Sequence, residues 1–180
     1  EDGTTRSILT DESWQVADSR VRFCDIYDGC VYDATHTPQF DRQAVINAKD
    51  DRSVLVPEMG EPILTHERLK PVDVIRTPKG ETVLDFGQNL TGTVALSLTA
   101  HVGDNVALSF AEVLDGDGNF YNANYRTAKC LYDYTCVEGA QEFFPTLTFY
   151  GFRYVRVDAF PGEVDPSAFT AVVIHSHLTR

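Results

Sequence analysis

Four carboxyl groups in this sequence are candidates for acid and base chemistry. Hydrolysis of a glycosidic bond usually needs two carboxyl groups flanking the bond, one of which is kept protonated by its surroundings. The candidates are Asp85, Glu112, Asp133 and Glu142. Acidic residues are abundant in this chain, 27 against 15 basic ones, so their presence alone carries little weight. The sequence alone does not place any two of the four at the separation that glycoside hydrolysis requires. We therefore expect no catalytic residue here.

The stretch TVLDFGQNLTG, residues 82–92, places polar groups where a buried strand should run. Asp85 alternates with apolar neighbours, and Gln88 and Asn89 come after a glycine, Gly87, that permits a tight bend. Buried polar side chains must be hydrogen-bonded or they destabilise the fold. We therefore predict a polar corner that fixes the fold, in which Gln88 and Asn89 bond to the backbone.

Aromatic residues crowd the stretch from residue 143 to residue 154, which suggests either a core or a sugar-stacking face. Successive strand residues point to opposite faces. For that reason Phe149, Tyr150, Phe152 and Tyr154 cannot all line one groove. Core packing is the favoured interpretation, and a binding face remains the alternative.

Two residues within that stretch have specific structural roles in our interpretation. Gly151 is expected to mark a bulge or a close backbone approach. Arg153 stands between aromatic residues and needs an acidic partner if it is buried. We predict that this partner is Asp85, with the two side chains within about 6 Å of each other.

The segment DGDGN predicts a tight hairpin turn and only weakly suggests a calcium site. Asp115, Asp117 and Asn119 copy the first three ligand positions of an EF-hand loop. Phe120 and Arg126 then stand where Gly and Glu should be, so the EF-hand interpretation fails. An irregular calcium site at these three residues is the weaker alternative, and otherwise we expect no cofactor.

His175 and His177 share one face of a predicted strand and could hold a metal ion between them. The sequence shows no third ligand. Two histidines near a strand end are more often surface residues, so we predict no metal site here.

Four cysteines could form two disulfides, but their spacing argues against it. Cys130 and Cys136 fall on one face of a strand, roughly 20 Å apart at about 3.3 Å per residue, whereas bridged Cα atoms lie within roughly 7 Å. Cys24 and Cys30 flank an Asp28–Gly29 turn, and we do not expect them to face each other across a two-residue loop. Neither spacing resembles a zinc motif. Free thiols are expected, with a long-range pair as the alternative.

A period of two dominates the chain from residue 72 onward, which is typical of half-buried strands. Val94, Leu96 and Leu98 point one way, and Val106, Leu108 and Phe110 repeat the pattern in the next strand. Further strands are predicted at residues 130–138, 152–160 and 169–177, and the one candidate for a short helix is 41–51. The predicted fold class is all-β, an antiparallel sandwich or jelly roll.

The first 60 residues differ from the rest. Trp14, Val16 and the segment 23–33 predict one or two strands, and the segment 34–62 is polar and without period. We assign 1–60 to the tail of an upstream β-domain plus a linker, and 61–180 to the β-sandwich domain.

A formal net charge of −12 argues against nucleic acid or an anionic membrane surface as the main partner. A neutral ligand such as a sugar is unaffected by that objection. No run approaches the roughly 18 apolar residues that a membrane helix needs, and the start of the sequence does not resemble a signal peptide. We expect a soluble protein, and the sequence does not decide between cytoplasm and secretion.

Several segments between Pro62 and His177 match the pattern of a known family. The most specific are DFGQN, which holds Asp85, Phe86, Gly87, Gln88 and Asn89, and GFRYV, which holds Gly151, Phe152, Arg153 and Tyr154. In this order they resemble the concanavalin-like β-sandwich domain of bacterial α-L-rhamnosidases, which are inverting glycoside hydrolases. We take these nine residues as the structural signature of the domain. Upstream, YDGCVYDAT resembles the end of that family's preceding β-domain, with Cys30 and Thr35 in place of Glu and Arg.

The resemblance implies a module without catalytic residues of its own. In that family the acid and base carboxylates belong to an (α/α)6 barrel that comes after the sandwich, and this sequence holds no helical repeat. The expected role is to pack against the barrel and help to shape its sugar site. The expected partners are the barrel and, through the parent enzyme, a rhamnose-containing carbohydrate. The alternatives are an autonomous carbohydrate-binding module and a purely structural spacer.

Overall fold

The computed structural model describes residues 3–47, 49 and 52–178. These residues divide into two compact units, and each is described by itself. One unit takes its described residues from 1–19 and 37–60, and the other from 20–36 and 61–180. The hairpin segment 20–36, which the sequence analysis placed upstream, thus lies in the same unit as the sandwich. The assignment of 1–60 and 61–180 to separate parent domains stays a prediction.

The first unit contains little regular structure. Strand β1 (Gln15–Val16) pairs antiparallel with β4 (Arg42–Gln43), and a short 3-10 helix, η1, spans Arg52–Val54. The short helix suggested for 41–51 is therefore wrong in its described part, because two of those residues extend to pair with β1. Residues 48, 50 and 51 lie outside the described residues. No helix in the described part of the chain is long and apolar enough to cross a membrane.

The second unit consists mainly of antiparallel strands, which confirms the all-β sandwich class. Its strands are β2 (Val21–Asp25), β3 (Gly29–Asp33), β5 (Ile63–Leu69), β6 (Asp73–Arg76), β7 (Thr82–Ala100), β8 (Asn105–Ala111), β9 (Val113–Leu114), β10 (Phe120–Tyr121), β11 (Leu131–Thr135), β12 (Gly139–Phe143), β13 (Tyr150–Ala159) and β14 (Phe169–Ser176). Two 3-10 helices, η2 (Ala123–Tyr125) and η3 (Pro166–Ala168), stand in the connections.

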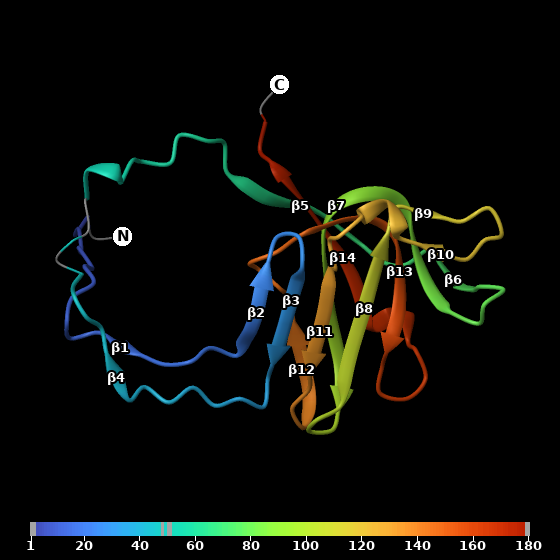
Figure 1. The fold of residues 1–180 in the computed structure, drawn as a ribbon, viewed down its shortest axis with the longest axis horizontal. Helices are drawn as coiled ribbons and strands as arrows, with labels where there is room; N and C mark the ends of the chain where they lie inside the picture. Colours follow the sequence, from blue (N-terminus) through green and yellow to red (C-terminus); the bar gives the residue numbers. More distant parts are fainter. Residues whose placement is uncertain (1–2, 48, 50–51, 179–180) are drawn as a thin grey trace. The chain divides into compact units, whose positions relative to one another are not determined.

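One curled sheet holds most of these strands, in the order β2-β3-β11-β8-β13-β7-β14-β5. Strands β6 and β12 also pair with β7. The first part of β7 pairs with β6 and β13, and its last part with β12 and β14. Figure 1 shows β7, in green, as a long and strongly bent strand. This single strand pairs with β6, β12, β13 and β14 along its length.

The core lies inside the curl and is rich in aromatic rings. Phe110 of β8 stacks on Tyr150 of β13, with ring centroids 3.9 Å apart, and meets Phe152 at 5.0 Å. Both of these β13 aromatics are buried, which confirms the preference for core packing over a sugar face at these two positions. Phe149, by contrast, is 45% exposed. The predicted alternation is also confirmed in β8, where the residues at every second position are buried.

The hairpin of β2 and β3 corrects one expectation about the cysteines. Cys24 and Cys30 are direct partners in the β2–β3 register, because the connecting loop has three residues rather than two. The Asp25 carboxylate builds that loop by accepting hydrogen bonds from the backbone N–H groups of Tyr27 and Asp28, at 2.7 and 2.9 Å. All four cysteines are free thiols, as predicted. The reason given for Cys24 and Cys30, that they would not face each other, was wrong.

A close backbone approach at Gly92 restricts what this position can hold. Gly92 lies in β7 between β13 and β14, and a Cβ atom there would stand 2.0 Å from the carbonyl oxygen of Val172. Real Cβ atoms do not approach backbone oxygens this closely, so any side chain would push β7 away from β14.

We expect Gly92→Ala to lower the free energy of unfolding by about 3 kcal/mol, the upper range for overpacking a dense interior. Gly116→Ala is the matched control, because Gly116 lies in a turn with open space around it, and we expect a change within about 0.5 kcal/mol. Urea unfolding followed by circular dichroism measures both, since the single Trp14 lies in the other unit. Equal midpoints for the two variants would contradict the close approach.

Candidate functional site

The signature residues meet at a large bulge between β7 and β13. On one side of the bulge Leu90 pairs with Phe152, and on the other Asp85 pairs with Tyr154. Between these pairs β13 has one residue, Arg153, whereas β7 has four. A bulge bends the longer strand and increases its twist. The DFGQN segment is therefore the point at which β7 leaves the regular ladder.

An ion pair joins the two strands across this bulge. Arg153 donates from Nε to Oδ1 of Asp85 at 2.8 Å and from Nη2 to Oδ2 at 2.9 Å, so the contact is bidentate. The backbone N–H of Gly87 donates to the same carboxylate at 2.7 Å. The hydrogen bonds from Arg153 hold the pKa of Asp85 below its ordinary value, although burial acts in the opposite direction. The predicted pairing of Asp85 with Arg153 is confirmed.

The other residues of the bulge divide between the core and solvent. Phe86 is buried and meets Phe152 edge to face at 5.7 Å. Gly87 adopts φ +81°, a left-handed conformation that favours glycine, and confirms the expected tight bend. On β13 the Arg153 guanidinium lies 5.0 Å from the ring centroid of Tyr154, within cation–π range.

The exposed side of the bulge is a set of amide and carboxylate groups. Asn89 donates from its amide nitrogen to one oxygen of Glu112 at 3.2 Å, and Asn124 donates to the other oxygen at 3.3 Å. Gln88 is exposed beside them. We call these four residues the corner surface. The expectation that Asn89 bonds to the backbone is wrong, because its amide reaches a carboxylate 23 residues away.

Gly151 does not mark the bulge itself. The register shift falls at Arg153, and a Cβ atom at Gly151 would make only an ordinary contact of 3.7 Å with the Glu112 carboxylate. The carbonyl oxygen of Gly151 instead accepts a hydrogen bond from the Tyr125 hydroxyl. Burial raises the pKa of Tyr125, so this hydroxyl stays protonated and remains a donor.

The connection from β10 to β11 contains two residues in a left-handed conformation. Arg126, with φ +58°, and Cys130, with φ +47°, are the non-glycine residues with positive φ in the described part of the chain. Such conformations persist where the surroundings hold them, and here Tyr125 anchors one side while Lys129 pairs with Asp28 at 3.0 Å on the other. Arg126 is exposed and follows Asn124 of the corner surface by two residues, and no sequence signal indicated its backbone conformation.

Three of the four carboxyl candidates are hydrogen-bonded within the fold. Asp85 is committed to Arg153, and Glu112 to two amides. The Asp133 carboxylate accepts a hydrogen bond from the amide of Asn105 at 2.7 Å. A glycosidase acid must be held protonated by its surroundings, whereas the pKa of the buried Asp85 is shifted down.

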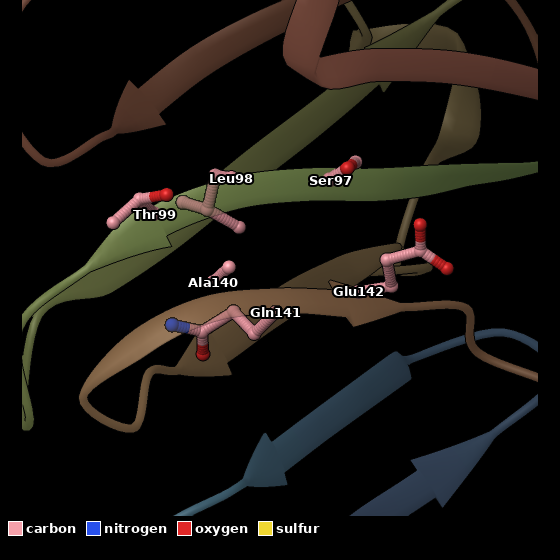
Figure 2. Close-up of a pocket in the computed structure, with 6 residues that line it drawn as sticks. All are labelled: Ser97, Leu98, Thr99, Ala140, Gln141 and Glu142. Carbon is pink, nitrogen blue, oxygen red and sulfur yellow. The ribbon is translucent and has the colours of Figure 1, made fainter.

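Glu142 lines a shallow hollow formed by residues of β7 and β12, as Figure 2 shows. The hollow measures about 380 Å³, and its lining residues are Ser97, Leu98, Thr99, Ala140, Gln141 and Glu142. None of these carries an aromatic ring on which a sugar could stack. The amide of Gln141 is used within the fold, since it donates to the carbonyl oxygens of Val137 and Gly139.

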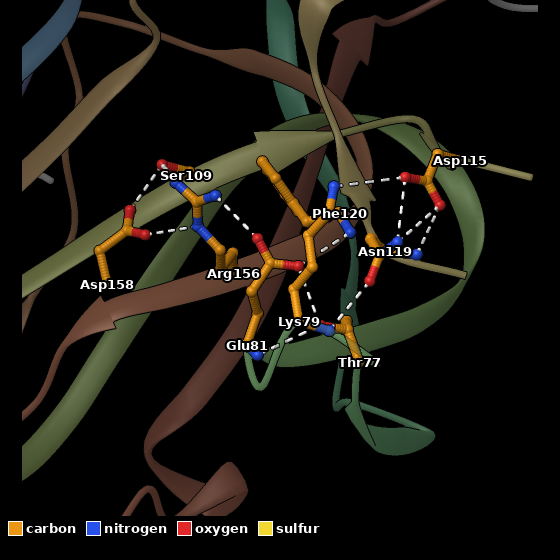
Figure 3. A network of polar contacts seen from close by, with 9 residues as sticks. All are labelled: Thr77, Lys79, Glu81, Ser109, Asp115, Asn119, Phe120, Arg156 and Asp158. Carbon is orange, nitrogen blue, oxygen red and sulfur yellow. Dashed lines mark hydrogen bonds and ion pairs between the residues drawn. The ribbon is translucent and has the colours of Figure 1, made fainter. Parts of the chain in front are cut away.

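The DGDGN segment forms the predicted hairpin turn between β9 and β10. The Asp115 carboxylate accepts from the backbone N–H groups of Asp117 and Asn119, at 3.0 and 2.7 Å, and from the Asn119 amide. Asn119 is buried and accepts from the backbone N–H of Lys79 at 3.1 Å, as Figure 3 shows. These oxygens are therefore engaged in building the turn, and a calcium ion at this segment stays a prediction.

A second charged network, also in Figure 3, was not predicted. Arg156 of β13 donates to Glu81 at 3.1 Å and to Asp158 at 2.5 Å, and its guanidinium lies 4.5 Å from the ring centroid of Phe120. Hydrogen bonds from Thr77, Phe120 and Arg156 lower the pKa of Glu81 against the effect of burial. The network ties the β9–β10 hairpin to the sheet, and no local pattern marks residues 75 positions apart as partners.

His175 of β14 and His177, which follows this strand, have a histidine neighbour that no sequence pattern indicated. His66 of β5 stacks on His175, with ring centroids 3.4 Å apart, and lies 5.8 Å from His177. The Nε2 atom of His66 faces the carbonyl oxygen of His175 at 3.1 Å. Within the ranges that the structure describes, no three His, Cys, Asp or Glu side chains are arranged to hold a metal ion.

Two family models, both describing domains of alpha-L-rhamnosidases, match this chain. Residues 75–175 match the bacterial alpha-L-rhamnosidase concanavalin-like domain, and residues 1–76 match the alpha-L-rhamnosidase N-terminal domain. An alpha-L-rhamnosidase of Alteromonas sp. is 34% identical over 98% of this chain and 21% of its own length.

Two solved structures share the fold. The alpha-L-rhamnosidase of Streptomyces avermitilis, complexed with L-rhamnose, superposes with a TM-score of 0.82 at 33% identity, over 97% of this chain and 18% of that one. The alpha-L-rhamnosidase of Aspergillus terreus gives 0.83 at 30% identity, over 99% and 22%. This chain therefore spans about a fifth of the length of these relatives.

We expect Asp85→Asn to lower the free energy of unfolding by about 2 kcal/mol at pH 7. Removing one partner of a fully buried pair costs about 3–5 kcal/mol, and the 38% exposure of the Arg153 side chain reduces that figure. Because the pKa of Asp85 is lowered in the folded protein, its contribution is complete above about pH 4 and is lost as the pH falls further. Urea midpoints at pH 7 and pH 3 test this.

Asp117→Asn removes the same formal charge at an exposed turn position and serves as the control. We expect it to change the free energy of unfolding by less than about 0.5 kcal/mol at pH 7. If Asp85→Asn behaved like this control at pH 7, the bidentate pair would not stabilise the corner.

Proposed function

This chain belongs to the bacterial α-L-rhamnosidase family, through its concanavalin-like domain, and on that premise we propose that it is a non-catalytic accessory module of an α-L-rhamnosidase. In this proposal the module supports the sugar site of a separate catalytic domain in the complete protein. The complete protein would remove terminal α-L-rhamnosyl groups from a rhamnose-containing carbohydrate.

The state of the signature carboxylate is the observation that carries the proposal. Asp85 is buried, doubly bonded to Arg153 and bonded to the backbone of Gly87, with a lowered pKa. A carboxylate held in this way stays ionised and cannot donate a proton to a glycosidic oxygen at neutral pH. This supports a structural use of the most specific family motif.

The corner surface is the part of the module that we assign to contact with the catalytic domain. Its three amide residues are exposed and Glu112 is half-buried, and two apolar residues adjoin this surface. Val72 is 70% exposed and approaches Gly87, and Val113 is 49% exposed next to Glu112 in the chain. Apolar groups within a polar rim are typical of protein interfaces. Contact at this end would place fixed hydrogen-bonding groups against the catalytic domain.

An autonomous carbohydrate-binding module remains the second candidate. Its support is the aromatic-rich stretch 143–154, of which Phe144 and Phe149 are 37% and 45% exposed. Tyr150 and Phe152, however, are buried against Phe110 and are not available for stacking on a sugar. The accessory role therefore has the stronger structural support.

We expect the 180-residue protein to show no turnover of 4-nitrophenyl α-L-rhamnopyranoside. We also expect a chimera to be active, in which this chain replaces the matching segment of the Streptomyces avermitilis relative, because the two folds superpose with a TM-score of 0.82. Enzyme-like turnover by the isolated chain would overturn the accessory role.

The same chimera tests the corner surface. Asn89→Ala combined with Asn124→Ala removes both amides that bond to Glu112, and we expect kcat/KM to fall on the order of tenfold, or about 1.4 kcal/mol. Asp117→Asn is the matched surface control and should leave kcat/KM unchanged. Equal activity of both variants, with unchanged unfolding midpoints, would remove this surface from the proposal.

Calorimetric titration of the isolated protein with L-rhamnose separates the two candidates. We expect no heat of binding at millimolar sugar, with or without calcium, because the best-placed aromatic rings are in the core. Saturable heat that is lost in Phe149→Ala and kept in Phe23→Ala, another exposed phenylalanine, would favour the autonomous binding module instead.

A further inference from the structure

Two thiols face each other at the edge of the sheet. Cys24 of β2 and Cys30 of β3 are direct partners in an antiparallel register. Directly opposite residues in such a pair have Cα atoms about 4.5–5.5 Å apart, and their side chains lie on the same face. Disulfides need Cα separations of about 4.4–6.8 Å. The backbone of this hairpin therefore already has the spacing of a cross-strand disulfide.

The pKa of Cys30 agrees with this placement. Burial raises it most, the neighbouring Cys24 thiol adds to the rise, and the Cys30 pKa reaches about 11. The pairing itself rests on the register, in which Cys24 lies directly opposite Cys30.

The surroundings give the two thiols different accessibility. Cys24 is partly exposed, whereas Cys30 is buried at 4% exposure and lines a hollow of about 40 Å³ with Tyr32 and Phe143 among its walls. An external reagent can reach Cys24 from solvent. Cys30 can then be reached only from within the protein, by the sulfur opposite it.

We propose that Cys24 and Cys30 form a redox-active dithiol that small-molecule disulfides convert to an intramolecular cross-strand disulfide. The Cys24 sulfur, as the thiolate, attacks the external disulfide and releases one thiol. Cys30 loses its proton and its sulfur attacks the Cys24 sulfur of the mixed disulfide, which releases the second thiol. Two protein thiols are oxidised, one external disulfide is reduced to two thiols, and the protons pass to the released thiols.

The cross-link would lock the edge at which β3 joins the sheet. β3 pairs in parallel with β11, and the position of Gly29 is fitted so closely to this neighbour that a Cβ there would lie 2.0 Å from the Leu131 carbonyl oxygen. Oxidation would therefore stiffen a hairpin that is already docked. This inference does not depend on the accessory role proposed above.

Tryptic mapping tests the pairing directly, because Cys24 and Cys30 share the peptide 23–42 while Cys130 and Cys136 share 130–153. We expect the 180-residue protein, after incubation with oxidised glutathione, to lose two of its four thiols. Peptide 23–42 should then lack two hydrogen atoms and carry no glutathione. A peptide 23–42 that keeps both thiols, carries two glutathiones or is cross-linked to 130–153 would overturn the proposal.

Variants and an unfolded reference complete the test. Cys30→Ser should stop at a stable glutathione adduct on Cys24, and Cys24→Ser should leave Cys30 unmodified. Cys136→Ser is the control and should still form the disulfide. The folded protein should close the disulfide at a ratio of oxidised to reduced glutathione at least tenfold lower than the urea-unfolded chain. Equal ratios would mean that the hairpin geometry contributes nothing, and would also overturn the proposal.

Discussion

The ion pair between Asp85 and Arg153 is the interaction on which the centre of this sandwich depends. β7 pairs with β13 on both sides of the bulge, and within it β7 carries four residues opposite a single residue of β13. Such a bulge leaves backbone groups without their ladder partners. The Asp85 carboxylate accepts from the Gly87 N–H and from Nε and Nη2 of Arg153, so it bonds to both strands at the bulge, and Arg153 neutralises its buried charge.

The bulge also decides which side chains meet. Before it, Tyr150 and Phe152 of β13 face the main core, whereas beyond it Tyr154 packs with Val83 in a second, smaller cluster. β7 carries three extra residues here, and because this number is odd, the side chains of β13 change face across the bulge. The aromatic side chains of β13 are thus divided between two clusters, and few of them are exposed for ligand binding. The polar, exposed side of the bulge is therefore the better candidate for a contact surface.

Much of this arrangement could be anticipated from local patterns. Alternation identified the strands, the DGDGN composition predicted its turn, and the position of Arg153 among aromatic residues indicated an acidic partner, Asp85, which is the more buried of the two. The failures have a common cause. Asn89 and Glu112, or Arg156 and Glu81, are far apart in sequence, and only the pairing of strands brings them within hydrogen-bonding distance.

Local sequence was enough to establish the fold class, the family and an acidic partner for Arg153, because these depend on side-chain periodicity, on motifs and on the position of an arginine among aromatic residues. Only the tertiary structure decided the register: that Cys24 faces Cys30, that His66 stacks on His175, and that the bulge falls at Arg153. Register depends on loop lengths and on the packing of distant strands, and a shift of one residue exchanges the buried and exposed faces. Local sequence does not contain that information.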